Sequence, residues 1–241
     1  MRTGRVRVVE HGLQDDGGPF LGLGVSYFTA LWRCRHDRKR LEADLDFLSK
    51  QGFSYYRMLS MVGYQPSWEE QEIAPVAFTN RDGKQVAAWP HYWEQLRTLV
   101  DLAYDKHGLR TQSSIFADAH LMPVKADRIE HMRRLLSEVV AGREHKLMLL
   151  EVANEAWKNG FPEEQGVVDL REFAAYLAER TEVPVAITSN PYFPDESLVV
   201  ARDLRQTPEQ QGYFAHSCHA DRGTPWVTAK IAICGSVLTA G

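Results

Sequence analysis

Short apolar segments alternate along the chain with segments in which apolar residues recur every three or four positions. The apolar runs predict six strands, at residues 20–28, 53–61, 109–116, 146–152, 183–189 and 212–219. The periodic segments predict five helices, at residues 37–50, 92–106, 126–140, 169–180 and 195–204. Strands that alternate with helices of about 10–15 residues indicate βαβ crossovers and a parallel sheet. Near-continuous apolar strands are also what a sheet covered on both faces requires.

The segment at residues 37–50 shows clear helix signals at both of its ends. Leu41, Leu45 and Leu48 recur at helical spacing behind Asp37, whose carboxylate can cap the first turn. Gly52 follows, and glycine commonly ends a helix. Residues 62–90 instead predict a long irregular loop rich in Gly, Pro, Asn and Asp, and loops of that length are often functional.

Two architectures satisfy this alternation, a doubly wound open sheet and a closed (β/α)8 barrel. The first requires a GxGxxG sequence just after its first strand, but Gly22 and Gly24 lie within the strand and no third glycine follows at the right spacing. We therefore predict an α/β fold of the TIM-barrel type with about six βα units. Residues 5–9 and a turn at 15–18 predict a β-hairpin that plugs the barrel floor. The chain is expected to form one domain, 1–241, with the hairpin at 1–18 and an atypical tail at 223–241.

The composition is that of an ordinary globular protein, with 44% hydrophobic and 25% charged residues. Its formal net charge of −4 lacks the basic excess that binding to nucleic acid favours. No apolar run approaches the ~20 residues of a membrane-spanning helix. Charged residues occupy the N-terminal positions where a signal peptide is apolar, so the chain as written is expected in the cytoplasm. The three cysteines are too few and too scattered for a disulfide framework.

Polar side chains follow the strand predicted at residues 146–152, where a barrel would carry its active site. Asn154 and Glu155 stand at the end of this strand, and Trp157 follows them in the loop. A carboxyl group can donate a proton to the leaving oxygen of a glycosidic bond, and an amide can hold a sugar hydroxyl. The same two residues could instead cap a helix that begins directly after the strand. Residue types and spacing leave both interpretations open.

Several motifs together resemble a known superfamily. EVANEAWKNGFP, at residues 151–162, is similar to the strand-four signature of the retaining (β/α)8 glycoside hydrolases, the cellulase-like superfamily that includes glycoside hydrolase family 5. The resemblance extends to FLGLGVSYFTALW at 20–32, to the arrangement of Gly52, Phe53 and Arg57, and to HGLRTQSSIF at 107–116. It spans roughly residues 18–222. It implies cleavage of O-glycosidic bonds by a retaining double displacement, and related enzymes are often secreted.

The resemblance implies roles for the matching residues. Glu155 matches the general acid/base, and Asn154 matches the residue that binds the hydroxyl beside the reacting carbon. Arg57 matches the arginine that orients the nucleophile. A buried ion pair between Arg57 and Glu151 is an alternative, and the two roles are compatible.

Further candidates lie at the ends of the third and sixth predicted strands. Asp118 and His120 could bind sugar hydroxyls, or they could cap the loop that contains them. His219 begins an HxxR pattern that resembles related hydrolases, and His216 would face the other way because side chains alternate along a strand. A flat aromatic face suits a sugar ring, although packing under the loops is the better interpretation for any single tryptophan. The tryptophans in or near loops are Trp32, Trp68, Trp89 and Trp157.

The expected partner is a carbohydrate, either an oligosaccharide or a polysaccharide. No short ligand spacing among the histidines indicates a metal site, and no motif requires a cofactor. Neither nucleic acid nor a membrane span is expected.

A second carboxylate is needed for the implied reaction, and in the superfamily it is a Glu that ends strand seven. Residues 223–241 contain no Asp or Glu, so the nucleophile is expected to be missing from this chain, which would be incomplete after strand six. Two alternatives therefore remain open. The first is a catalytically inactive barrel that binds carbohydrate or a protein partner, and the second is an enzyme of another reaction class on the same fold.

Overall fold

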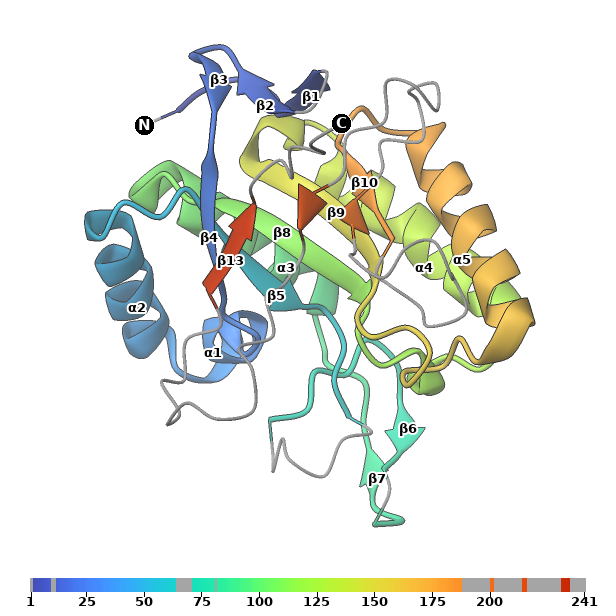
Figure 1. Cartoon of the computed structure of the whole chain (residues 1–241). Coiled ribbons are helices and arrows are strands. Elements are labelled where there is room, and N and C mark those ends of the chain that lie inside the picture. The colour runs from blue at the N-terminus through green and yellow to red at the C-terminus, as the bar shows by residue number, and fades with distance from the viewer. Residues whose placement is uncertain are drawn as a thin grey trace, which may run out of the picture.

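The main sheet of the protein is parallel over most of its width. The computed structural model describes residues 2–9, 12–63, 71–80 and 82–187, and also the strand residues 200–201, 214–215 and 231–234. The sheet has six strands in the order β10-β9-β8-β5-β4-β13 (Figure 1). Its parallel members are β4 (Gly22–Ser26), β5 (Tyr55–Leu59), β8 (Arg110–Phe116), β9 (Leu147–Ala153) and β10 (Val185–Ala186). The predicted α/β architecture is confirmed, and within the described residues the sheet is open, with β10 and β13 at its edges.

The later strands pair differently from the prediction. β12 (Phe214–Ala215), within the predicted sixth parallel strand, pairs antiparallel with β11 (Val200–Ala201) in a separate sheet. The helix predicted at 195–204 is wrong at these two residues, where β-branched Val200 favours a strand. β13 (Ile231–Cys234), in the predicted tail, pairs antiparallel with β4. The pattern therefore identified residues 214–215 as strand but not their partner.

Helices cover the sheet as the crossovers require. α3 and α4 lie behind the sheet in the view of Figure 1, and α2 and α5 flank it on opposite sides. The Asp37 side chain caps α2 by accepting from the Arg40 amide, and Gly108 ends α3 with a φ of +70°. The helices are α1 (Ala30–His36), α2 (Arg38–Lys50), α3 (Tyr92–His107), α4 (Lys125–Leu135), which continues as the π-helix Leu136–Val140, and α5 (Glu163–Ala178). None of the helices in these described ranges is long and apolar enough to cross a membrane.

Shorter elements occupy the loops. The 3-10 helices Ala119–Leu121 and Glu144–Lys146 follow β8 and precede β9. The predicted irregular segment 62–90 contains a small hairpin of β6 (Phe78–Thr79) and β7 (Gln85–Val86). In Figure 1 this hairpin lies at the opposite end of the molecule from the N-terminal strands, because the loops after the parallel strands gather at one end.

The core between the sheet and the helices contains a buried histidine. His131 on α4 packs against Trp93, with ring centroids 4.9 Å apart, and against Phe116 of β8, at 5.8 Å. Burial, reinforced by the positive charge of Arg134, lowers the pKa of His131 to about 3. The imidazole is therefore neutral in the folded protein over most of the acidic range.

This histidine should make the fold sensitive to acid. The pKa of His131 is depressed on folding, so protonation below the unfolded-state value of ~6.5 favours the unfolded chain. We expect the free energy of unfolding to fall by about 2–3 kcal/mol between neutral pH and about pH 4.5 through this residue alone. Urea titrations at a series of pH values measure the effect. In the His131→Gln variant this part of the slope should disappear, and an unchanged slope would contradict the assignment.

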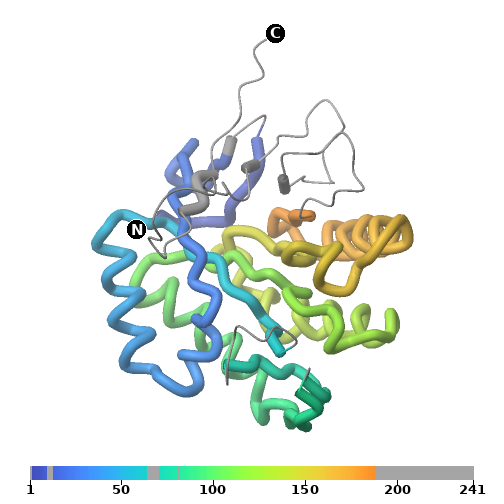
Figure 2. The backbone as a smooth tube through the Cα atoms, turned by 60° about the horizontal axis from the view of Figure 1, so that its bottom comes forward, coloured from blue at the N-terminus to red at the C-terminus, as the bar shows by residue number. Residues whose placement is uncertain are grey.

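The N-terminal residues form a three-stranded antiparallel sheet over the starts of the parallel strands. Its strands are β1 (Arg7–Val9), β2 (Gly12–Asp15) and β3 (Gly18–Phe20), so the segment is a three-stranded meander rather than the predicted hairpin. Val8 and Leu13 pack with Tyr55 of β5 and Met148 of β9. In Figure 2 this sheet lies at the top, across one end of the parallel strands. Its position agrees with the expected plug at the barrel floor.

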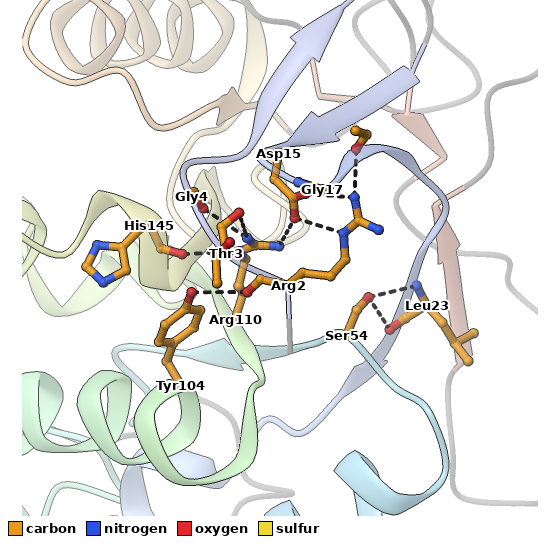
Figure 3. A network of polar contacts seen from close by, with 11 residues as sticks. Arg2, Thr3, Gly4, Asp15, Gly17, Leu23, Ser54, Tyr104, Arg110 and His145 are labelled. Carbon is orange, nitrogen blue, oxygen red and sulfur yellow. Dashed lines mark hydrogen bonds and ion pairs between the residues drawn. The ribbon is translucent and has the colours of Figure 1, made fainter.

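A buried cluster of charges attaches this plug to β8 (Figure 3). Arg110 Nη1 donates to Asp15 Oδ2 at 2.9 Å, and Arg2 binds both carboxylate oxygens at 2.8 and 2.7 Å. Arg110 Nη2 also donates to the carbonyl of Gly4 at 2.9 Å. Burial opposes the charge on Asp15, but hydrogen bonds from Arg2, the Gly17 amide and Arg110 outweigh it and hold the pKa of Asp15 below its usual range.

Neutralising Asp15 should loosen the plug. In the Asp15→Asn variant two guanidinium groups lose their counter-charge, and Arg110 is only 2% exposed, so we expect the free energy of unfolding to fall by about 2–3 kcal/mol. The midpoint of urea denaturation measures this loss. Asp16→Asn, at the exposed neighbouring position, serves as the control and should change the midpoint little. Equal midpoints for the two variants would show that the cluster does not anchor the plug.

Candidate active site

The register of the parallel strands brings four polar side chains together on one face of the sheet. Arg57 of β5 stands opposite Gln112 of β8, and Ser114 of β8 stands opposite Glu151 of β9. Positions two apart on a strand share a face, so all four side chains point to the same side. That side faces away from the covering helices and would line the interior of a barrel.

Arg57 and Glu151 form a bidentate ion pair on this face. Arg57 Nε lies 2.8 Å from Glu151 Oε2, and Arg57 Nη2 lies 2.8 Å from Oε1. Both side chains are buried, at 5% and 0% exposed. Ser114 Oγ donates to Oε2 as well, and Gln112 Nε2 lies 3.4 Å from the same oxygen. The sequence-based alternative of a buried Arg57–Glu151 pair is confirmed.

The same guanidinium also reaches the end of β9. Arg57 Nη2 donates to Asn154 Oδ1 at 2.8 Å, which fixes the orientation of the Asn154 amide. The Arg57 guanidinium lies 5.3 Å from the ring centroid of Phe28, which follows β4. Arg57 therefore connects the buried carboxylate with the first polar residue beyond the strand, whereas its role in orienting a nucleophile stays a prediction.

Glu155 lies at the rim of this cluster in an unusual backbone conformation. Its φ is +40°, a region that non-glycine residues seldom adopt and that costs on the order of 1–3 kcal/mol. Its side chain is 44% exposed, and Oε1 lies 3.7 Å from Lys158 Nζ. The N-cap of α5 is Pro162, so Asn154 and Glu155 do not cap the helix that follows β9. The capping alternative from the sequence is therefore wrong.

The conformation of Glu155 has a measurable consequence. Glycine accepts a positive φ without penalty, so Glu155→Gly should be more stable than Glu155→Ala by about 1 kcal/mol. Glu172, in the middle of α5, provides the matched control, because there Gly should be less stable than Ala by about 1 kcal/mol. Denaturant midpoints of the four variants test the sign. The same order at both positions would contradict a strained backbone at Glu155.

Asp118 and His120 lie in the loop after β8. Asp118 is 2% exposed, and its Oδ2 accepts from the amide of Gly63, beyond β5, at 3.1 Å. His120 Nδ1 lies 3.4 Å from Asp118 Oδ1, and the His120 side chain is 36% exposed. The Asp118 side chain thus binds the loop after β5 and makes no cap hydrogen bond to its own 3-10 helix, whereas His120 remains accessible at the surface. The binding of sugar hydroxyls by either residue stays a prediction.

The tryptophans differ in their accessibility. Trp157, in the loop after β9, is 40% exposed, and Lys158 Nζ lies 4.5 Å from its ring centroid. Trp32 stacks on His36 with ring centroids 4.9 Å apart, and Trp89 meets the edge of the same imidazole at 5.5 Å. Both tryptophan rings therefore pack against His36. Trp157 therefore offers the freer aromatic face. Three sequence candidates, Trp68, His216 and His219, lie outside the described residues.

Two residues that the sequence analysis did not single out support the site. Asn159 is 2% exposed and donates through Nδ2 to the Asn154 carbonyl at 2.7 Å. Arg128 of α4 donates to the Gly160 carbonyl at 3.1 Å. The Asn159-Gly160 dipeptide is a turn signal that marks the position of a tight loop but does not identify its contacts. Arg128 left no local signal, because its partners lie on other segments.

A cavity of about 660 Å³ lies away from this site, at the starts of β5 and β8. Phe53, Lys106 and His107 are among the residues that line it. Its cations already have carboxylate partners, since Arg2 pairs with Asp15 and Lys106 with Glu42. Active sites of parallel α/β barrels lie at the other end of the strands. The cluster around Arg57 and Glu155 is therefore the better candidate for an active site.

Among the residues with described side chains, no group of three or more His, Cys, Asp or Glu could hold a metal ion.

Comparisons with known proteins identify the architecture. No protein-family model and no curated protein matches the sequence. Among solved structures, a glycoside hydrolase family 5 protein from Bacteroides vulgatus aligns with a TM-score of 0.54 and 15% identity over 81% of this chain and 43% of its own. An endo-1,4-β-mannanase from Rhizomucor miehei aligns with a TM-score of 0.55 and 13% identity, over 76% and 60%. An exo-β-1,4-mannosidase from an Opitutaceae bacterium aligns with a TM-score of 0.52 and 19% identity, over 74% and 33%.

These likenesses concern the fold, because the identities are low. The chain spans between 33% and 60% of the length of the three solved structures. The parallel strands, the covering helices and the open sheet agree with such partial coverage. The described part of the chain therefore has the fold of a portion of a glycoside hydrolase family 5-like (β/α) barrel.

Proposed function

We propose that the chain carries the acid/base side of a retaining glycoside hydrolase active site. Glu155 is the general acid/base, which protonates the leaving oxygen and then activates water. Asn154 binds a sugar hydroxyl, and Arg57 holds the Asn154 amide in place. The substrate is an oligosaccharide or a polysaccharide, and the neighbouring structures with mannanase and mannosidase activity make β-mannosides a first choice to test.

The observation that carries this proposal is the bridge made by Arg57. It joins the fully buried carboxylate of Glu151 to the Asn154 amide, directly before an accessible carboxyl group at a strand end. A general acid must reach the leaving oxygen, and the 44% exposure of the Glu155 side chain permits this. A positioned amide beside it can bind the substrate without rearrangement. His120, His219, Asp118 and Trp157 are proposed as further sugar contacts.

The proposal does not place the nucleophile within this sequence. A retaining enzyme needs a second carboxylate about 5–5.5 Å from the acid/base. Glu151 is unsuitable, because its side chain is 0% exposed and both oxygens are held by Arg57. Residues 223–241 contain no Asp or Glu. Double displacement therefore requires a carboxylate that neither Glu151 nor residues 223–241 supply.

The stereochemistry of hydrolysis tests the proposal. The complete protein is mixed with manno-, gluco- and galacto-oligosaccharides, and proton NMR follows the first sugar anomer released. The proposal predicts an initial product with the anomeric configuration of the substrate. Initial release of the opposite anomer would contradict a double displacement.

A second candidate function is a catalytically inactive barrel that binds carbohydrate. The exposed Trp157 favours it, since an aromatic face can bind a sugar ring without any carboxylate. Saturable binding of the same oligosaccharides in calorimetry, weakened by Trp157→Ala and unaccompanied by turnover, would support this candidate.

A further inference from the structure

Glu155 needs support from its surroundings, because its positive φ is not the preference of a glutamate. Its carbonyl accepts from the amides of Lys158 at 2.8 Å and Asn159 at 3.2 Å. These bonds close a tight turn after β9 but belong to the turn itself. A persistent strained conformation requires that neighbouring structure fix the turn in place.

Asn159 provides the first connection between the turn and its surroundings. Its side-chain Nδ2 donates to the Asn154 carbonyl at 2.7 Å, immediately before Glu155. Its own carbonyl accepts from the Ala119 amide, in the loop after β8, at 3.0 Å. Asn159 is thus hydrogen-bonded both to the residue before Glu155 and to the loop after β8.

Arg128 provides the second connection, from α4. Its guanidinium donates to the carbonyls of Met122 at 2.6 Å and Ala119 at 3.0 Å in the loop after β8, and to that of Gly160 at 3.1 Å in the loop after β9. The face of Phe161 lies 4.7 Å from the guanidinium carbon. Arg128 is 7% exposed, and burial lowers its pKa below the usual range. Burying a guanidinium costs desolvation free energy, and the three hydrogen bonds to carbonyls of the two loops offset this cost.

The two loops also pack too closely for any side chain at the contact. A Cβ at Gly160 would lie 2.9 Å from the Ala119 Cβ and 3.0 Å from the His120 amide nitrogen, and the φ of Gly160 is +99°. The turn that carries Glu155 is therefore pressed against the loop that carries Asp118 and His120.

We propose that Arg128 and Asn159 form a clamp that joins the loops after β8 and β9 and holds Glu155 in its left-handed conformation. They are positioning residues for the Glu155 carboxyl and for the accessible His120 beside it. The catalytic role of the clamp rests on the proposed glycosidase function, whereas the hydrogen bonds that form the clamp do not depend on that function.

Two substitutions weaken the clamp without removing Glu155. Asn159→Ala deletes the donor to the Asn154 carbonyl. Arg128→Lys keeps the positive charge, but a single ammonium cannot reproduce the planar fork that serves three carbonyls. Arg133→Lys is the matched control, because Arg133 lies on the same helix, is 58% exposed at its side chain and pairs with Glu130 within α4.

NMR of this chain tests the clamp directly. A positive φ brings the amide and α protons of Glu155 close together and gives a strong intraresidue NOE. We expect this NOE to weaken in Asn159→Ala and Arg128→Lys, and we expect the Ala119 amide to exchange faster with solvent. Arg133→Lys should match the unmodified chain. An unchanged NOE together with unchanged exchange in both clamp variants would overturn the proposal.

Turnover by the complete protein tests the catalytic meaning. Misplacing a catalytic group by about 1 Å can cost about 100-fold, so we expect kcat to fall by up to about 100-fold in the clamp variants with little change in KM. Full kcat in a variant whose Glu155 NOE has weakened would refute the positioning role. No turnover by the unmodified protein would contradict the glycosidase function and this role with it, while the NMR comparison would still decide whether the clamp exists.

Discussion

Replacing Glu155 with glutamine should lower kcat/KM of the complete protein for an unactivated glycoside by about 10²–10⁴-fold. The glutamine amide is nearly the same size as the carboxyl group, but it cannot donate a proton to the leaving oxygen or remove one from water. The ion pair of Arg57 with Glu151 and its bond to Asn154 do not involve the Glu155 side chain, so the fold should persist. Initial rates of reducing-sugar release measure the loss.

Glu164→Gln is the control for this substitution. Glu164 is an exposed residue in the first turn of α5, a few residues further along the same segment. Its replacement should leave the rate close to that of the unmodified protein. Equal rates for Glu155→Gln and the unmodified protein would remove Glu155 from the reaction and would favour chemistry at another residue.

Removing the Arg57 side chain should produce the largest loss of stability. In Arg57→Met the carboxylate of Glu151, which is 0% exposed, loses its bidentate ion pair, while its contacts with Ser114 and Gln112 remain. Removal of one partner of a buried ion pair typically lowers the free energy of unfolding by about 3–5 kcal/mol, because the other charge stays buried without compensation. Urea denaturation followed by circular dichroism measures the free energy of unfolding.

A double substitution separates the ion pair from general damage to the core. In Arg57→Met with Glu151→Leu no unpaired charge is left, so much of the lost stability should return. Arg40→Met supplies the surface control, because Arg40 pairs with Asp44 at 2.7 Å but is 61% exposed, and we expect a change within about 1 kcal/mol. A double variant no more stable than Arg57→Met would indicate that packing, not the buried charge, dominates at this position.

The regular part of the fold was predictable because local patterns and tertiary structure agree there. The run at 146–152 became β9, and the Asp37 signal marks the start of α2. The pairing of β12 with β11, and of β13 with β4, was not predictable in the same way. Which strands pair depends on what the rest of the chain leaves unoccupied, and strand preference does not contain that information. The helix α1 was missed because seven residues are too few to show a period.

The candidate site was predictable in position but not in conformation. Strand alternation placed Asn154 and Glu155 at the end of β9 and put Glu151 on the side that faces Arg57. The positive φ of Glu155 depends on contacts with Asn159 and Arg128, and the latter lies on a different βα unit. Such contacts arise only when the loops are assembled, so no motif around Glu155 could reveal them.

The dependence of the Glu155→Gln defect on the leaving group tests the central claim most directly. Aryl glycosides whose phenols range from strongly to weakly acidic are hydrolysed by the complete protein and by the variant. A general acid assists poor leaving groups most, so the defect in kcat/KM, which reports only the first displacement, should be large for weakly acidic phenols and should nearly vanish for dinitrophenol. A defect of the same size for every phenol, or no defect at all, would contradict the assignment of Glu155 as the acid/base.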